Sequence, residues 1–193
     1  YYDSYLKLGN VNKSFTFENG LTLIKEALQP LGQSYINLVD KSVKERWMDI
    51  YPNKNKATGA FSSGLYGVHA YVLLNNVDNL NSVFTTAHEL GHAFHSYFSD
   101  SFQPYETSHY PTFLAEIAST ANEILLIKHC FNTAETDDEK LFYLDKYLSM
   151  FKSTLFRQTM FSEFELYAHS QIEKKLPLSK EKLKNFYGTL NKT

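Results

Sequence analysis

Residues 82–98 read SVFTTAHELGHAFHSYF and contain the pentapeptide His88-Glu89-Leu90-Gly91-His92. This stretch is expected to form a helix from about Ser82 to about Phe98. On a helix, two histidines four positions apart lie on one face, one turn from each other. Two imidazoles in this arrangement can bind a single zinc ion with Zn–N bonds of about 2.0–2.1 Å. The stretch therefore predicts a helix and a metal site on it.

Glu89 is expected to act beside the metal, and Gly91 is expected to allow close packing of the helix. The residue after His88 is rotated by about 100° around a helix, which puts the Glu89 carboxylate beside the metal. Zinc lowers the pKa of a bound water to about 7, and a nearby carboxylate can take the proton of that water during attack on a carbonyl. Gly91 has no side chain, so another element can pack closely against the helix. A free carboxylate beside the metal favours a catalytic site over a purely structural one.

The third metal ligand is not supplied by the same helix. A catalytic zinc usually has three protein ligands and keeps a fourth position for water. The extended motif H-E-x-x-H-x-x-G-x-x-H would supply that ligand, but His95 and Phe98 stand where the motif needs glycine and histidine. The downstream candidates are Asp100, Glu106, His109, Glu116 and Glu123.

Glu116 and Glu123 are the candidates that fall in the next expected helix. They are seven positions apart, so they share one face, two turns apart. One of them can bind the metal while the other accepts a hydrogen bond from a ligand histidine, as metal sites often require. Leucine, isoleucine and alanine surround both, which is unusual for two merely solvated carboxylates. These residues alone leave the choice between the two open.

The rest of the pattern is mostly helical, with a small extended region and no clear linker or repeat. We expect one compact body, mostly α with a small β region, in which the H-E-x-x-H helix packs on the second, glutamate-bearing helix. Thr112 and Ser179 are expected as helix N-caps. Helices are expected over residues 18–28, 34–47, 112–131, about 137–175 as one helix or a broken pair, and 180–186; strands over 59–62 and 70–74; and a loop over 99–110.

Composition excludes several classes of protein. The chain has 193 residues, of which 43% are hydrophobic and 21% charged, so it is not a disordered tail. A net charge of −2 gives no global attraction to nucleic acid or to an anionic membrane, and we expect neither as a partner. The longest apolar run, residues 124–127, is far too short to span a bilayer. The single cysteine, Cys130, allows no internal disulfide, fits a reducing compartment, and is expected to be a buried core thiol.

Longer stretches around these motifs resemble a known family. Residues 87–97, AHELGHAFHSY, and residues 113–120, FLAEIAST, look like oligoendopeptidase F of the thimet-oligopeptidase-like zinc metallopeptidases. The similarity also includes the segments ERW at 45–47, YPNK at 51–54, GAFS at 59–62, FRQTMF at 156–161 and EFE at 163–165. The resemblance implies a helical zincin-type catalytic domain that hydrolyses short oligopeptides in the cytoplasm.

The resemblance also implies particular roles for the site residues. His88, His92 and Glu116 would bind one zinc ion per chain, Glu89 would be the general base, and Glu123 would orient a ligand histidine.

The expected substrate is an oligopeptide in extended form. Gly59, Ala60 and Phe61 would offer backbone hydrogen bonds to it, and His109 and Tyr110 would line its groove. His69, between loop and strand, is a further candidate for substrate contact.

One departure from the family concerns the extent of the chain. Full-length members have an additional N-terminal helical region and a C-terminal stretch with a histidine and tyrosines that stabilise the oxyanion. Residues 1–193 are therefore expected to form the zinc-binding part of a catalytic domain, and the missing remainder of that domain is a possible partner. A start at Tyr1 instead of methionine fits this expectation.

Two other functions are compatible with parts of the pattern. Glu-x-x-His is also the signature of carboxylate-bridged di-metal helical bundles. It occurs twice, as Glu89–His92 and Glu106–His109, and the second lies between two prolines. The other alternative is a non-catalytic zinc-binding module. His95, on the same face as His88 and His92, is expected to pack or hydrogen-bond near the site.

Overall fold

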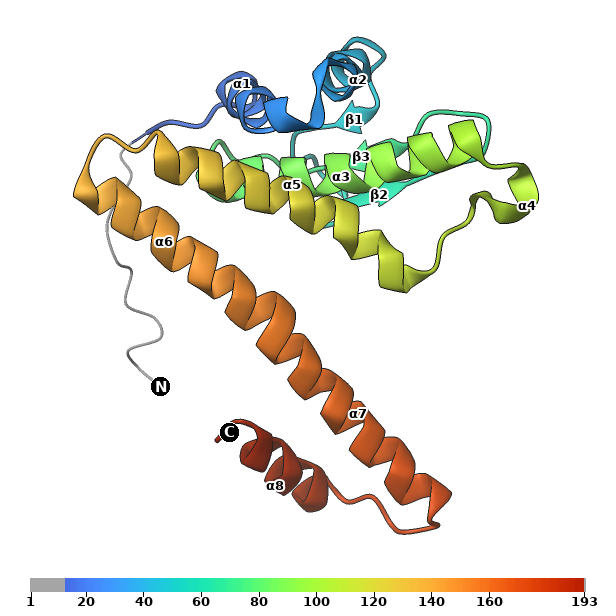
Figure 1. The fold of residues 1–193 in the computed structure, drawn as a ribbon. Coiled ribbons are helices and arrows are strands. Elements are labelled where there is room, and N and C mark those ends of the chain that lie inside the picture. Colours follow the sequence, from blue (N-terminus) through green and yellow to red (C-terminus); the bar gives the residue numbers. More distant parts are fainter. Residues whose placement is uncertain (1–12, 193) are drawn as a thin grey trace. The chain divides into compact units, whose positions relative to one another are not determined.

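The computed structural model describes residues 13–192, so the expected domain extends beyond the described residues at both ends. Helices dominate, and a small sheet stands beside them, as expected (Figure 1). The elements are α1 (Phe17–Ala27), a 3-10 turn (Gln29–Leu31), α2 (Gln33–Lys44), β1 (Met48–Asp49), β2 (Phe61–Ser63), β3 (Tyr71–Leu73), α3 (Leu80–Phe102), α4 (Tyr105–Ser108), α5 (Thr112–Asn132), α6 (Asp137–Phe151), a π-helical turn (Lys152–Phe156), α7 (Arg157–Glu173) and α8 (Lys180–Leu190).

The chain divides into two compact units, Tyr1–Tyr143 and Leu144–Thr193, where the sequence suggested a single body. The division falls inside α6, a helix without proline or glycine, so its sequence carries no linker signal. No helix in the described part of the chain is both long and apolar enough to cross a bilayer.

In the first unit, α3 lies at the centre. It packs against α5, α1 and the strands β2 and β3. Leu90 and Phe94 of α3 are fully buried beside Trp47 and Leu74. The strand order is β1-β3-β2, with β1 parallel and β2 antiparallel to β3, so β2 is an edge strand. The site-bearing helix is therefore held on several sides by apolar contacts.

The helix α3 is longer than expected at both ends. The Asn79 side chain caps it by accepting a hydrogen bond from the Ser82 backbone N–H at 2.9 Å. At the other end it continues to Phe102, because the first residue that opposes a helix is Pro104. The expected loop over 99–110 therefore contains the last turn of α3 and the short helix α4.

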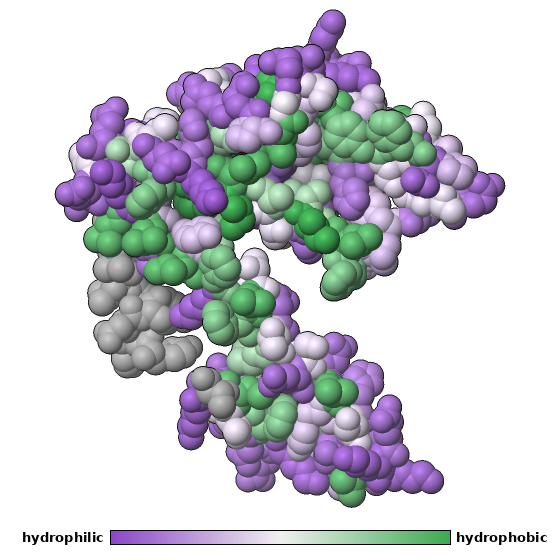
Figure 2. All heavy atoms as spheres, in the orientation of Figure 1, coloured by the Kyte–Doolittle hydropathy of each residue, from purple (hydrophilic) through white to green (hydrophobic). Residues whose placement is uncertain are grey.

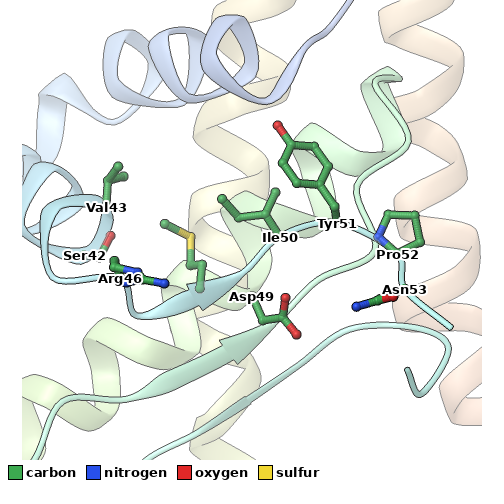
Figure 3. Close-up of a pocket in the computed structure, with 9 residues that line it drawn as sticks. Ser42, Val43, Arg46, Asp49, Ile50, Tyr51, Pro52 and Asn53 are labelled. Atoms are coloured by element: carbon green, nitrogen blue, oxygen red, sulfur yellow. The ribbon is translucent and has the colours of Figure 1, made fainter. Parts of the chain in front are cut away.

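The expected helix over 34–47 ends early. Arg46 has a φ of +59°, which is incompatible with a continuing right-handed helix. Trp47 then leads into β1, and its carbonyl accepts a hydrogen bond from Val72 N–H. The sequence did not predict β1, because a two-residue strand has no alternation to detect. A pocket of about 380 Å³ lies at this turn (Figure 3).

Smaller differences concern caps and strand ends. Thr112 is the first residue of α5, and the capping position belongs to Pro111, which makes no side-chain cap. Gly59 has a φ of +87° and, like Ala60, precedes the strand β2. Ser179 is confirmed as the N-cap of α8, accepting from Lys182 N–H. Cys130 is buried, as expected.

Candidate metal centre

The helices α3 and α5 approach each other most closely at Gly91. A Cβ atom on Gly91 would lie 2.6 Å from the Cα atom of Ser119 and 2.9 Å from the carbonyl oxygen of Ala118, distances that real Cβ atoms do not adopt. The glycine therefore permits direct backbone contact between the two helices, as the sequence suggested. This contact brings the side chains on both sides of it into one cluster.

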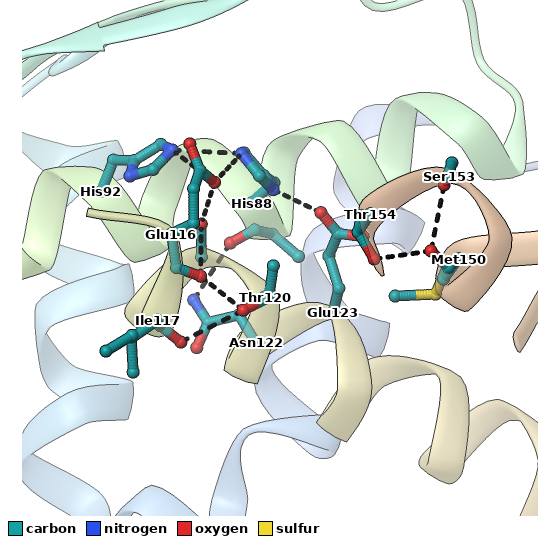
Figure 4. Close-up of polar contacts among 12 residues, drawn as sticks. His88, His92, Glu116, Ile117, Thr120, Asn122, Glu123, Met150, Ser153 and Thr154 are labelled. Carbon is teal, nitrogen blue, oxygen red and sulfur yellow. Dashed lines mark hydrogen bonds and ion pairs between the residues drawn. The ribbon is translucent and has the colours of Figure 1, made fainter. Parts of the chain in front are cut away.

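Three potential ligand atoms meet between these helices (Figure 4). Nε2 of His88 lies 3.1 Å from Nε2 of His92, and Oε2 of Glu116 lies 3.3 Å and 3.5 Å from these two atoms respectively. In a tetrahedral zinc site with bonds of about 2.0–2.1 Å, ligand atoms are about 3.3 Å apart. Two imidazoles and a carboxylate are also a donor set that zinc prefers. Both the spacing and the chemistry of the three residues fit a zinc ion.

Glu123 does not join this triangle and instead contacts the far side of His88. Its Oε1 atom hydrogen-bonds Nδ1 of His88, which leaves Nε2 directed toward His92 and Glu116. Burial alone would lower the pKa of His88, but the hydrogen bond and the charge of Glu123 outweigh it, and the pKa lies above its ordinary value. This contact has the form of a carboxylate that orients a metal-binding imidazole.

The second histidine has the opposite electrostatic balance. Burial lowers the pKa of His92, although the negative charge of Glu116 works in the other direction. Burial also lowers the pKa of His95. A lower pKa keeps the imidazole of His92 neutral, which is the state that binds a metal ion.

Glu89 is buried next to the triangle, with 7% of its surface exposed. Its Oε2 atom has no hydrogen-bond partner among the described residues. Burial raises the pKa of Glu89 above its ordinary value, while the adjacent His88 works in the opposite direction. A buried carboxylate with a free oxygen and a raised pKa is suited to accept and release a proton.

Tyr110 is linked to α3 one turn beyond His92. Its ring stacks on His95 with centroids 3.8 Å apart, and its hydroxyl lies 2.8 Å from Oγ of Ser96. His95 therefore packs near the site, as expected. His109 precedes Tyr110 and is exposed, immediately after α4.

The other residues predicted to contact substrate lie on the sheet side of α3. Gly59 and Phe61 are exposed at the start of the edge strand β2, and Ala60 between them is half-buried. His69 stacks on Trp47 with ring centroids 5.0 Å apart, and its Nδ1 atom lies 2.9 Å from the Ala70 carbonyl oxygen. These contacts give His69 a packing role in addition to any contact with substrate.

The remaining ligand candidates stay apart from the triangle. Glu106 lies on the four-residue helix α4, and His109 follows its end. Within residues 13–192, His88, His92 and Glu116 are the only group of three or more such side chains close enough to share a metal ion. The second Glu-x-x-His pair therefore provides no second metal cluster there, contrary to what a di-metal bundle requires.

Sequence reasoning missed three residues that hold this centre together. Asn122 is 1% exposed, and its Nδ2 atom donates to the Ala87 carbonyl at 3.0 Å, while its Oδ1 atom accepts from the Tyr35 hydroxyl at 3.1 Å. Asn122 and Tyr35 are two of the three residues, and the third is Ser119, whose hydroxyl donates to Oε2 of Glu116 at 2.8 Å. Asparagine is unfavourable inside a helix, so Asn122 carried a signal that it has a tertiary partner.

Comparisons with known proteins identify the family of the chain. Residues 4–193 match the family model described as Peptidase family M3. The chain is 41% identical over 192 residues to Oligopeptidase PepF of Bacillus subtilis (strain 168), and the match covers 99% of this chain and 29% of the relative. The chain thus spans less than a third of that relative's length.

Solved structures show the same similarity. A crystal structure from Chlamydophila abortus matches with a TM-score of 0.83 at 43% identity, over 98% of this chain and 32% of the other. The crystal structure of oligoendopeptidase-F from Enterococcus faecium matches with a TM-score of 0.59 at 31% identity, over 98% of this chain and 26% of the other.

Proposed function

Because the chain belongs to peptidase family M3, we propose that it is the zinc-binding part of a metallopeptidase that hydrolyses short oligopeptides. The observation that carries this proposal is the triangle of His88 Nε2, His92 Nε2 and Glu116 Oε2 beside the buried Glu89 carboxylate. Each feature has a counterpart in peptide hydrolysis: three ligands for one metal ion and one base that is not a ligand.

In this proposal His88, His92 and Glu116 hold one zinc ion per chain. When bound, zinc acts as a Lewis acid that polarises the peptide carbonyl and makes water a stronger acid. Glu123 keeps the His88 ring in the orientation that presents Nε2. The two glutamates have different proposed roles because their surroundings differ: the Glu116 side chain is 60% exposed, whereas Glu89 is buried.

Glu89 is the proton carrier of the reaction. Its free Oε2 atom accepts a proton from the attacking water and then delivers that proton to the nitrogen of the departing amine. The raised pKa favours the first transfer, because a more basic carboxylate accepts the proton of water more readily. Burial also excludes bulk water, which would otherwise compete for that proton.

The edge strand β2 is the proposed guide for the substrate. Its free edge can add an extended peptide through backbone hydrogen bonds, starting from Gly59, Ala60 and Phe61. His109, Tyr110 and His69 are further proposed contacts. Binding of an extended peptide along β2 selects short, flexible peptides and disfavours folded proteins. The cytoplasmic location implied by the family resemblance is part of the same proposal.

The test is metal-dependent hydrolysis of an internally quenched oligopeptide. The protein used carries this chain within a sequence of the relatives' full length. We expect activity to disappear when a chelator removes the metal, and to return with one equivalent of zinc per chain. Activity that survives complete removal of metal would contradict the proposal.

A further inference from the structure

Glu116 is the most exposed of the three candidate ligands. Its side chain is 60% exposed, compared with 25% for His88 and 18% for His92. A glutamate side chain has three rotatable torsions and loses much rotamer freedom when it is fixed. A metal site that depends on Glu116 therefore gains from any contact that holds its carboxylate in place.

One stripe of α5 provides a hydrogen-bond partner for each candidate ligand. The Ala115 backbone hydrogen-bonds His92, the Ser119 hydroxyl hydrogen-bonds Glu116, and the Glu123 carboxylate hydrogen-bonds His88. Residues 115, 119 and 123 are spaced by four positions, so they lie on one face of the helix. Ser119 is the middle residue of this stripe, at the point where α5 touches Gly91 of α3.

The hydroxyl of Ser119 contacts the oxygen atom of Glu116 that is the candidate metal ligand. Its Oγ donates to Oε2 of Glu116 at 2.8 Å, and this same Oε2 atom faces Nε2 of both histidines. The alternative acceptor, the Glu116 carbonyl, is farther away at 3.2 Å. Ser119 is fully buried, so water does not compete for its hydroxyl. A hydrogen bond to a carboxylate is stronger than one to a neutral carbonyl, which favours the first contact.

We propose that Ser119 is a positioning residue that fixes the carboxylate of Glu116 for metal binding. This inference rests on the proposed zinc site and adds a residue to it. Removal of such an outer hydrogen-bond partner typically weakens metal binding by about 10- to 100-fold. The loss of zinc affinity should depend on the presence of Glu116, because Ser119 itself does not belong to the triangle.

The test is zinc affinity of the 193-residue chain, measured by competition with a chromophoric chelator. Ser119→Ala removes the hydroxyl and is expected to raise the zinc dissociation constant by about 10- to 100-fold. Thr120→Ala is the matched control, because the Thr120 hydroxyl donates to the carbonyl of Glu116 and not to its carboxylate; it should leave the affinity unchanged. Thermal unfolding of the metal-free variants checks that both are folded.

A double-mutant comparison separates a positioning role from a general packing role. In a Glu116→Ala background, Ser119→Ala should produce no further loss of affinity. An unchanged affinity for the single variant, or an equal loss in both backgrounds, would overturn the inference while leaving the zinc site intact. A wild-type chain that takes up no zinc would overturn the zinc site itself, and this inference with it.

A measurement on the wild-type chain covers the case in which Ser119→Ala does not fold. In a crystal structure of the zinc-loaded chain, Ser119 Oγ should lie within hydrogen-bond distance of a Glu116 carboxylate oxygen. A separation of more than about 3.5 Å from both oxygens would overturn the inference.

Discussion

Glu89 and Glu116 are the same amino acid in different surroundings. Glu89 is buried, and the loss of hydration raises its pKa, whereas the Glu116 side chain is 60% exposed. A raised pKa suits a group that must both accept and release a proton. An exposed carboxylate beside two imidazoles suits a metal ligand.

The first prediction concerns this division of roles. In a protein of the relatives' full length, Glu89→Gln should keep its zinc and lose about 10²–10⁴-fold in kcat for peptide hydrolysis, since glutamine cannot take a proton from water. Glu106→Gln, at an exposed glutamate outside the triangle, is the matched control and should retain activity. Loss of metal from Glu89→Gln would instead indicate that Glu89 is a metal ligand, as in the carboxylate-bridged di-metal bundles. Full turnover with intact metal would mean that another base serves the water, and a parent protein that binds zinc without any activity would favour the non-catalytic module.

At the scale of elements, the crossing of α3 and α5 determines the geometry of the site. His88 and His92 belong to one helix, and Glu116, Ser119 and Glu123 belong to the other. The two backbones meet at Gly91, where even a methyl group would overlap with backbone atoms. Backbone atoms cannot rotate away as a flexible side chain can, so the helices themselves would have to move apart.

We therefore predict that Gly91→Ala destabilises the chain. Overpacking of this kind typically costs about 1–3 kcal/mol, more than the gain in helix propensity that alanine brings. Gly188→Ala in α8 is the control, because no atom lies within 4 Å of the added Cβ position; it should stabilise its helix by about 0.5–1 kcal/mol. The measurement is the urea midpoint of the helical signal. A Gly91→Ala chain as stable as the wild type would rule out so close a crossing.

Two hydrogen bonds made by Glu139, to two different residues, hold the start of α6. Glu139 N–H donates to the Thr136 hydroxyl at 3.2 Å, and the Glu139 carboxylate accepts from Glu135 N–H at 2.9 Å. Lys13 lies 3.0 Å from the other carboxylate oxygen. The hydrogen bond from the Glu135 backbone, together with Lys13, holds the pKa of Glu139 below its ordinary value.

This lowered pKa predicts a defined pH dependence of stability. The stabilisation from Glu139 is fully present above its ordinary pKa of about 4.3, and it is lost as the pH falls through the lower pKa of the folded state. Glu139→Gln does not titrate there, so its melting temperature should lie below that of the wild type at pH 7. The two should converge as the pH falls below about 4. A difference that stays constant from pH 7 to pH 3 would contradict this assignment.

Local signals in the sequence predicted some elements better than others. Three predictions depended only on neighbours in the chain: the helix that carries His88 and His92, the Ser179 cap and the strand around Val72. The structure has all three as expected. The early end of α2 depends on the positive φ of Arg46, for which arginine gives no warning. The contacts of Ser119 and Asn122 depend on how two helices cross, which spacing along one helix cannot give.

The chain as a whole covers 29% of the length of its Bacillus subtilis relative. Within the chain, several large hydrophobic side chains are exposed at the surface (Figure 2). Phe113 at the start of α5 is 86% exposed, and Ile117, one turn later and next to Glu116, is 57% exposed. We expect these side chains to face a peptide or further parts of a longer protein.

The corresponding prediction is that the isolated chain binds zinc but hydrolyses peptides very slowly. The chain spans 29% of the length of its Bacillus subtilis relative, and we expect a protein of that length to add groups that assist the reaction; one oxyanion donor, for example, typically contributes about 10²–10³-fold in rate. Poor positioning of the peptide adds to this loss. A fluorogenic peptide assay that compares the zinc-loaded 193-residue chain with a protein of the relatives' full length measures the effect. A chain that alone equals the full-length protein in kcat/KM would refute it.

The metal content of the purified chain shows whether His88, His92 and Glu116 hold one zinc ion. We predict one zinc per wild-type chain after dialysis against metal-free buffer, and loss of most of it in Glu116→Ala, because two imidazoles alone bind zinc weakly. Glu106→Ala should keep the full amount. Full zinc occupancy in Glu116→Ala, or two metal ions in each wild-type chain, would mean that these three residues do not form a site for one zinc ion.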